Sequence, residues 1–178
     1  MRLILPYPSE EEVKQRVIAA IARFYRHDPE LLDVDVNERT ITHKLAEYLQ
    51  DEFPEWHVDC EYNRLGTDVK RLSLISEVVT PFDTEAKTVF PDIIIHRRRK
   101  KKNLLVMEVK KISGDDETKD YEKLEAFTQD PNYRYCFGLF LRIGWPIDHL
   151  ELELFIQGEK TGNWTEDLRQ ALLGVNGL

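Results

Sequence analysis

The chain has little of what marks a secreted or membrane-spanning protein. It contains only two cysteines, Cys60 and Cys136, which lie in separate apolar stretches without the spacing of a zinc site. Free thiols in a reducing compartment are therefore expected. No apolar run approaches the ~20 residues of a membrane helix. The short apolar start is cut off by Pro6 and then by acids, unlike a secretory signal. We expect a cytoplasmic protein with no membrane contact.

An excess of positive charge is also missing. The formal net charge is −8, which argues against a protein that coats nucleic acid non-specifically but leaves room for a local basic patch. The one dense patch is the run of six cations at 97–102. There is no repeat, low-complexity tract or linker-like composition. A length of 178 residues with 42% apolar residues predicts a single domain over 1–178.

Periodicity and capping signals predict alternating helices and strands. The Ser9 cap and apolar spacing indicate a first helix, and the strict alternation at 150–157 predicts a strand with one wet face. The segment 63–88 is mixed, with a strand expected near 72–79. Helices are expected over 9–26, 37–52 and 116–128 and from 163, and strands over 56–62, 89–96, 103–110, 133–143 and 150–157. The order predicts an α/β domain with a mixed central sheet.

The stretch FPDIIIHRRRKKKNLLVMEVKK, residues 90–111, has the form of a hairpin with charges in otherwise apolar strands. A turn centred on Lys100 places Asp92 opposite Glu108. Because side chains alternate between the faces of a strand, Lys110 shares a face with both carboxylates. A slip of one residue would separate them. The same register opposes Ile94 to Val106 and His96 to Leu104.

Two carboxylates opposed in a sheet repel one another unless they share a proton or a cation. Carboxylate oxygens at the end of a hairpin suit Mg²⁺ or Mn²⁺, which keep several waters. Lys110 would add a positive charge that orients water and stabilises charge on a phosphate. The alternative is an ordinary ion pair of Lys110 with Asp92 or Glu108 at the wet end of the hairpin.

The pattern of Pro91-Asp92, an apolar strand, a hairpin and Glu108-Val109-Lys110 resembles the PD-(D/E)XK nuclease superfamily. Its two acids are separated by 16 positions, from 92 to 108. The sequence over residues 37–128 is similar to a group of small bacterial or phage proteins in that superfamily. The resemblance implies a restriction-endonuclease-like fold, a three-layer α/β/α arrangement with a central mixed sheet flanked by helices.

The resemblance also implies site residues. Asp92 and Glu108 would be the metal ligands with the Val109 carbonyl as a third, and Lys110 would position the attacking water. Glu38 matches a further acid that the superfamily often places on the preceding helix, and it lies on the inward face of that helix. A capping box beginning at Asp35 is an equally good account of Glu38.

Four further residues are candidates for nucleic-acid contact: Lys123, Arg39, His43 and Lys111. For Lys123 a solvated helix face is the alternative, and for His43 a surface position. Glu61 ends a strand and either faces the site or is solvated.

The basic run must close its turn without glycine, which predicts a longer loop. Its tip lies at the opposite end of the strands from Asp92 and Glu108, so it is not expected beside a scissile bond. Six adjacent cations would either bind a phosphate backbone or form a solvated turn that protects the sheet edge.

The function expected from this resemblance is an enzyme, a Mg²⁺-dependent nuclease that hydrolyses phosphodiester bonds, with DNA as the expected substrate. The alternative is a catalytically silent nuclease-fold module with a binding or regulatory role, such as a phage or defence accessory protein. A phosphohydrolase acting on other substrates is a third reading. Since many nucleases of this kind use two active sites to cut both strands, a homodimer is expected by analogy.

Overall fold

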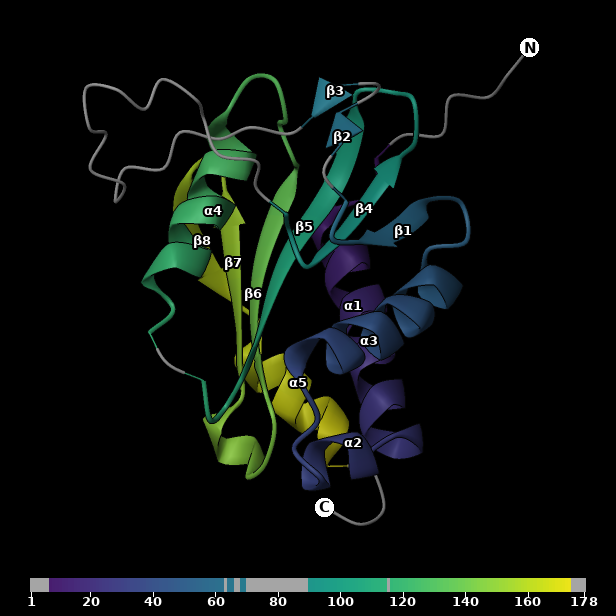
Figure 1. The fold of residues 1–178 in the computed structure, drawn as a ribbon, viewed down its shortest axis with the longest axis vertical. Coiled ribbons are helices and arrows are strands. Elements are labelled where there is room, and N and C mark those ends of the chain that lie inside the picture. The colour runs from purple at the N-terminus through teal and green to yellow at the C-terminus, as the bar shows by residue number, and fades with distance from the viewer. Residues whose placement is uncertain (1–6, 63, 66–67, 70–89, 115, 174–178) are drawn as a thin grey trace.

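The fold is built on a six-stranded mixed sheet in the order β1-β4-β5-β6-β7-β8 (Figure 1). The computed structural model describes residues 7–62, 64–65, 68–69, 90–114 and 116–173. Its strands are β1 (His57–Cys60), β4 (Ile93–Arg97), β5 (Lys102–Lys111), β6 (Phe137–Ile143), β7 (Glu151–Ile156) and β8 (Glu159–Asn163), with β2 (Arg64–Leu65) and β3 (Asp68–Val69) forming a separate pair. Among the described strands of the six-stranded sheet, β5 and β6 pair in parallel and the other neighbours are antiparallel.

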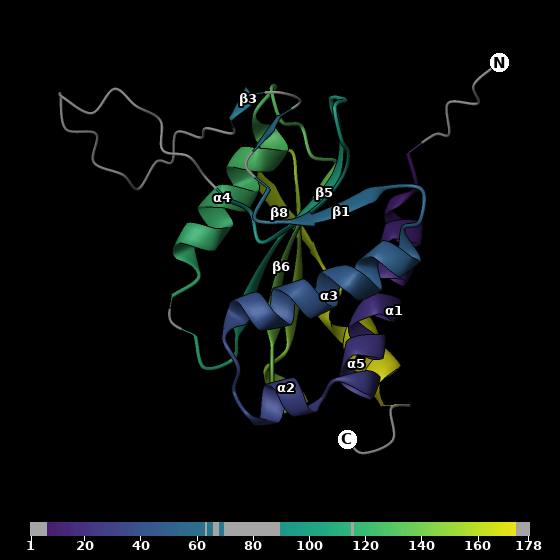
Figure 2. The same ribbon diagram turned by 45° about the vertical axis from the view of Figure 1, so that its right-hand side comes forward.

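Helices cover both faces of this sheet. Helix α4 lies on one face, whereas α1, α3 and α5 lie on the other, and the two views agree on this (Figures 1 and 2). The helices are α1 (Glu10–His27), α2 (Glu30–Asp33), α3 (Glu38–Glu52), α4 (Thr118–Gln129) and α5 (Thr165–Leu172), with a 3-10 turn η1 (Ile147–His149). The predicted mixed α/β class is therefore confirmed.

Strand β4 divides its side chains between two hydrophobic cores. Ile93 and Ile95 enter the larger core under α1, α3 and α5, while Ile94 enters the smaller core under α4. Phe127 and Phe140 fill that smaller core and are fully buried. Because both faces are covered, the strands read as continuous apolar runs, and any charge among them needs a partner.

The starts of α1 and α3 follow their sequence signals, whereas the helix expected from 163 begins at Thr165. The Ser9 hydroxyl accepts a hydrogen bond from Glu12 N at 3.2 Å, and the Asn37 side chain accepts one from Thr40 N at 2.9 Å. Strand β8 was not predicted. The strand expected near 72–79 falls outside the described residues.

The prediction that one face of β7 is exposed to solvent is wrong. Glu153, on the face expected to be wet, is only 7% exposed, because α4 lies over it and its carboxylate is bound by Tyr121 and Lys160. These two partners compensate a carboxylate that would otherwise be costly to bury.

The predicted hairpin register is confirmed at the end that carries the acids. Ile93 pairs with Met107 and Ile94 with Val106, in line with an opposition of Asp92 and Glu108. At the other end the register shifts after Ile95, so His96 pairs with Asn103 and not, as predicted, with Leu104. The irregularity adjoins a four-residue turn, 98–101, in which Arg99 has φ 60°. A turn longer than two residues was expected in the absence of glycine.

In the part of the chain that the structure describes, no helix has both the length and the apolar character needed to cross a membrane.

Candidate active site

Glu108 is a nearly inaccessible acid in the middle of the sheet. It lies on β5, is 1% exposed and faces α4, where Lys123 Nζ is 2.7 Å from its Oε2 atom. Its other oxygen, Oε1, is buried and has no hydrogen-bond partner in the part of the chain that is described. Burial and the nearby Asp92 carboxylate raise the pKa of Glu108 well above its usual value, although Lys123 opposes this. A buried acceptor without a donor is costly, and a cation would satisfy it.

Asp92 lies beside Glu108, directly before β4. Its Oδ2 atom accepts a hydrogen bond from Val109 N at 2.8 Å, and its carbonyl accepts one from Glu61 N at 3.1 Å. Burial raises the pKa of Asp92 to about 6, while the hydrogen bond from Val109 and the charge of Lys123 counteract part of the rise. The two carboxylates are therefore held together in surroundings that penalise their charge.

Lys110 projects from β5 on the same face as Glu108, as the strand period predicts. Its ammonium pairs with Asp120 Oδ2 of α4 at 2.9 Å, so the expected alternative partners, Asp92 and Glu108, are not the ones it contacts. Asp120 Oδ1 also lies 3.3 Å from Lys123 Nζ, which makes this aspartate a bridge between the two lysines. Asp120 was missed by sequence reasoning. Its place four residues before the inward-facing Leu124 was the available signal.

The solvated helix face weighed for Lys123 is wrong, because its ammonium is directed at the sheet. Burial by itself would lower the pKa of Lys123, but the charges of Glu108, Asp120 and Asp92 outweigh it and raise the pKa. Lys123 is thus a fixed cation within the site and not a surface charge. It is the one member of the predicted nucleic-acid contacts that the structure brings to the paired acids.

Glu38 is the first residue of α3, and Asn37 is its N-cap, so the capping box proposed from Asp35 is wrong. The Glu38 carboxylate instead accepts a hydrogen bond from Lys111 N at 3.1 Å, at the end of β5. Burial of Asp92 is the main cause of its raised pKa, and the negative charge of Glu38 adds to the rise. Glu38 therefore borders the site and ties α3 to the strand that carries Glu108.

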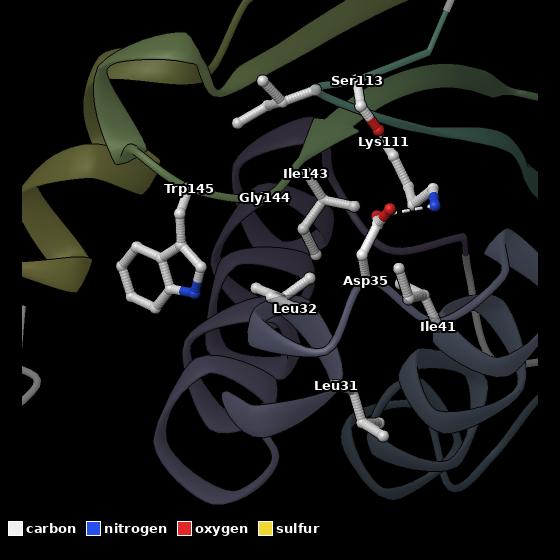
Figure 3. A pocket seen from close by; sticks show the side chains of 10 residues that line it. Leu31, Leu32, Asp35, Ile41, Lys111, Ser113, Ile143, Gly144 and Trp145 are labelled. Carbon is white, nitrogen blue, oxygen red and sulfur yellow. Dashed lines mark hydrogen bonds and ion pairs between the residues drawn. The ribbon is translucent and has the colours of Figure 1, made fainter.

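Lys111 points to the opposite face of the sheet from Lys110. Its ammonium lies 2.7 Å from Asp35 Oδ1 at one side of a pocket of about 220 Å³, with Trp145 at the other side (Figure 3). The remaining walls are largely apolar and include Leu32 and Ile143. This pocket is separate from the paired acids.

The other candidates for nucleic-acid contact lie at the surface. Arg39 pairs with Glu61 at 3.0 Å and is 83% exposed, and His43 lies 3.4 Å from Glu47. Glu61 is therefore turned toward Arg39 and contributes its backbone, not its carboxylate, to the position of Asp92.

The basic run is partly engaged at the far end of the hairpin. The guanidinium of Arg97 lies 4.9 Å from the centre of the Trp56 ring, and Arg98 pairs with Asp59. These contacts hold the flanks of the turn, while 99–101 are exposed. The turn is not beside Glu108, because β5 runs from Lys102 to Lys111 between them.

The residues present fit a hard divalent cation that takes only a few of its ligands from the protein. Asp92, Glu108 Oε1 and the Val109 carbonyl offer oxygen donors, the type that Mg²⁺ and Mn²⁺ prefer. Among the described residues no group of three or more His, Cys, Asp or Glu side chains is assembled as a metal site. A bound cation would therefore need solvent or substrate oxygens to complete its coordination.

Comparison with known proteins adds no relative: no family model, curated protein or solved structure matches the chain.

Proposed function

We propose that the protein is a Mg²⁺-dependent nuclease of restriction-endonuclease-like fold that acts on DNA. The observation that supports this most directly is the unpartnered Oε1 atom of Glu108, a buried acceptor beside Asp92 with Lys110 on the same face. The mixed sheet with helices on both faces is compatible with that fold. Acids and a lysine in this arrangement suit phosphodiester hydrolysis better than acyl or redox chemistry.

Each charged residue has a distinct task in this proposal. Asp92, Glu108 and the Val109 carbonyl would hold the cation, which when bound supplies Lewis-acid activation of water and of the scissile phosphate. Lys110 would orient the attacking water and offset negative charge on the phosphate. Asp120 positions the Lys110 ammonium through the 2.9 Å contact.

Cleavage assays on matched variants test the proposal. Supercoiled plasmid, linear duplex, single-stranded DNA and RNA are incubated with Mg²⁺ or Mn²⁺ and with wild type, Asp92→Asn, Glu108→Gln or Lys110→Met. We expect metal-dependent cleavage of DNA by wild type and a loss on the order of 10²-fold or more in each variant. The exposed Lys119, on the same helix as Asp120, provides the control variant Lys119→Met, which should cleave like wild type.

Cleavage that is independent of metal and equal in all variants would mean a contaminant and would refute the proposal. Circular dichroism and thermal unfolding of each variant separate lost chemistry from lost fold.

A catalytically silent binding module is the second candidate, and the ion pairing of the site favours it. The Lys123 ammonium lies at one oxygen of Glu108, and Asp120 pairs with Lys110, so part of the site's charge is already compensated by groups of the protein itself. This role predicts a stable partner complex that Glu108→Gln leaves intact. Strong metal-dependent turnover would exclude it as the only role.

A further inference from the structure

Lys123 enters the site from a different layer of the fold than the paired acids. The acids belong to the β4–β5 hairpin, whereas Lys123 belongs to α4, which packs on the sheet through Leu124 and Phe127. Its ammonium lies 2.7 Å from Glu108 Oε2 and 3.3 Å from Asp120 Oδ1. The side chain is therefore held by two carboxylates from two elements.

The two oxygens of Glu108 have different surroundings. Oε2 faces the Lys123 ammonium, and Oε1 has no hydrogen-bond partner within the described residues, although the side chain is only 1% exposed. A buried carboxylate with one neutralised and one free oxygen can accept a single further cation. Oε2, the oxygen that faces Lys123, is closed to a metal ion for as long as Lys123 stays in place.

The formal charge of the cluster agrees with this division. Four carboxylates (Asp92, Glu108, Asp120 and Glu38) and two ammonium groups (Lys110 and Lys123) give a formal charge of −2, which one divalent cation neutralises. A second divalent cation would leave the cluster positive.

We propose that Lys123 is a built-in counter-cation of this site, which occupies one oxygen of Glu108 and limits the site to a single divalent cation per chain. The inference rests on the proposed function and deepens it. Since the two oxygens of one carboxylate are neighbours, Lys123 lies beside any ion bound at Oε1. It thereby supplies the positive charge that a second metal ion would otherwise bring to a substrate phosphate.

Titration calorimetry with Mn²⁺ tests this without any substrate. The ion is titrated at pH 7.5 into wild type, Lys123→Met, Lys123→Arg and the exposed control Lys119→Met. Methionine keeps an unbranched side chain that is only one atom shorter and removes the charge that repels and competes with the metal. We expect Lys123→Met to bind Mn²⁺ roughly tenfold more tightly or to take up a second ion. Lys123→Arg and Lys119→Met should match wild type, with no more than one ion each.

Equal affinity and stoichiometry in Lys123→Met and wild type, whether both bind or neither does, would overturn the inference. Two ions in the wild type would also overturn it. A wild type that binds one ion, with the expected gain in Lys123→Met, but cleaves no nucleic acid would refute the nuclease function and leave the counter-cation role standing. If Lys123→Met fails to fold, Lys123→Gln replaces it, with the same expected gain.

Discussion

Asp92 and Val109 are joined across the hairpin by a side chain and not by the backbone: Asp92 Oδ2 accepts from Val109 N at 2.8 Å. Strand β4 begins at Ile93, so the carboxylate continues the pairing one residue beyond the strand. The same residue is thereby part of the sheet and part of the candidate site. Its burial gives it a pKa of about 6, which has a consequence for stability.

Asp92→Asn should stabilise the metal-free protein at neutral pH. The folded chain holds the Asp92 proton more tightly than the unfolded chain, whose pKa is near 3.8, so this contribution is favourable below about pH 4 and is lost as the pH rises through 6. Asparagine does not titrate and can still accept from Val109. Urea unfolding in chelator should show a gain of roughly 1–2 kcal/mol at pH 7.5 that shrinks as the pH falls from about 6 to about 4. A loss of stability at pH 7.5 would contradict the assignment.

Glu38 should stabilise the protein through its contact with Lys111 N and not through helix capping. Glu38→Ala removes the acceptor at 3.1 Å, and we expect a loss of about 1 kcal/mol in the free energy of unfolding. Glu38→Gln keeps an oxygen there and should lose less than half as much. Equal losses in the two variants would show that the hydrogen bond contributes nothing.

Asp59 should make the protein sensitive to acid. Burial alone would raise its pKa, but hydrogen bonds from His96 and Arg98 outweigh burial and hold the pKa below its usual range. The stability that this provides is present at pH 5 and above and is lost as the pH falls toward 2. The free energy of unfolding of the wild type should exceed that of Asp59→Asn by about 1–3 kcal/mol at pH 7. This difference should narrow below pH 4. A gap independent of pH would contradict an ionised Asp59.

The exposed part of the basic turn should be dispensable for metal binding. A triple variant, Arg99→Ala with Lys100→Ala and Lys101→Ala, changes charges at the far end of β5 from Glu108. We expect Mn²⁺ affinity and cleavage at saturating DNA to equal those of wild type, because exposed charges at that distance are screened by salt. Lost cleavage at saturating DNA would place the turn beside the reacting phosphate.

The hairpin was predictable because its information is local. The period of two along β4 and β5 set which residues share a face, and the missing glycine set the length of the turn. The alignment of Asp92 with Glu108 was predicted from a turn centred on Lys100. In the structure the turn spans 98–101, and the register shift after Ile95 restores that alignment.

The contributions of other elements were not predictable in the same way. Asp120 and Lys123 reach the site only because α4 docks over β5, and a helix pattern does not say which strand it will cover. Likewise, Glu38 shows a capping pattern in sequence, but its tertiary contact with Lys111 decides its role. The wet face expected for β7 failed for the same reason, since α4 also covers Glu153.

Helix α4 couples hydrophobic packing to charge placement. Phe127 fixes it to the smaller core, where its ring lies 5.4 Å from that of Tyr133, and one turn earlier the same helix delivers Lys123 to Glu108. A fault in that apolar contact would shift the ammonium away from the carboxylate without altering any charged residue. The apolar packing under α4 therefore sets the charge balance at Glu108, and a substitution in that core would alter the balance although it removes no ionised group.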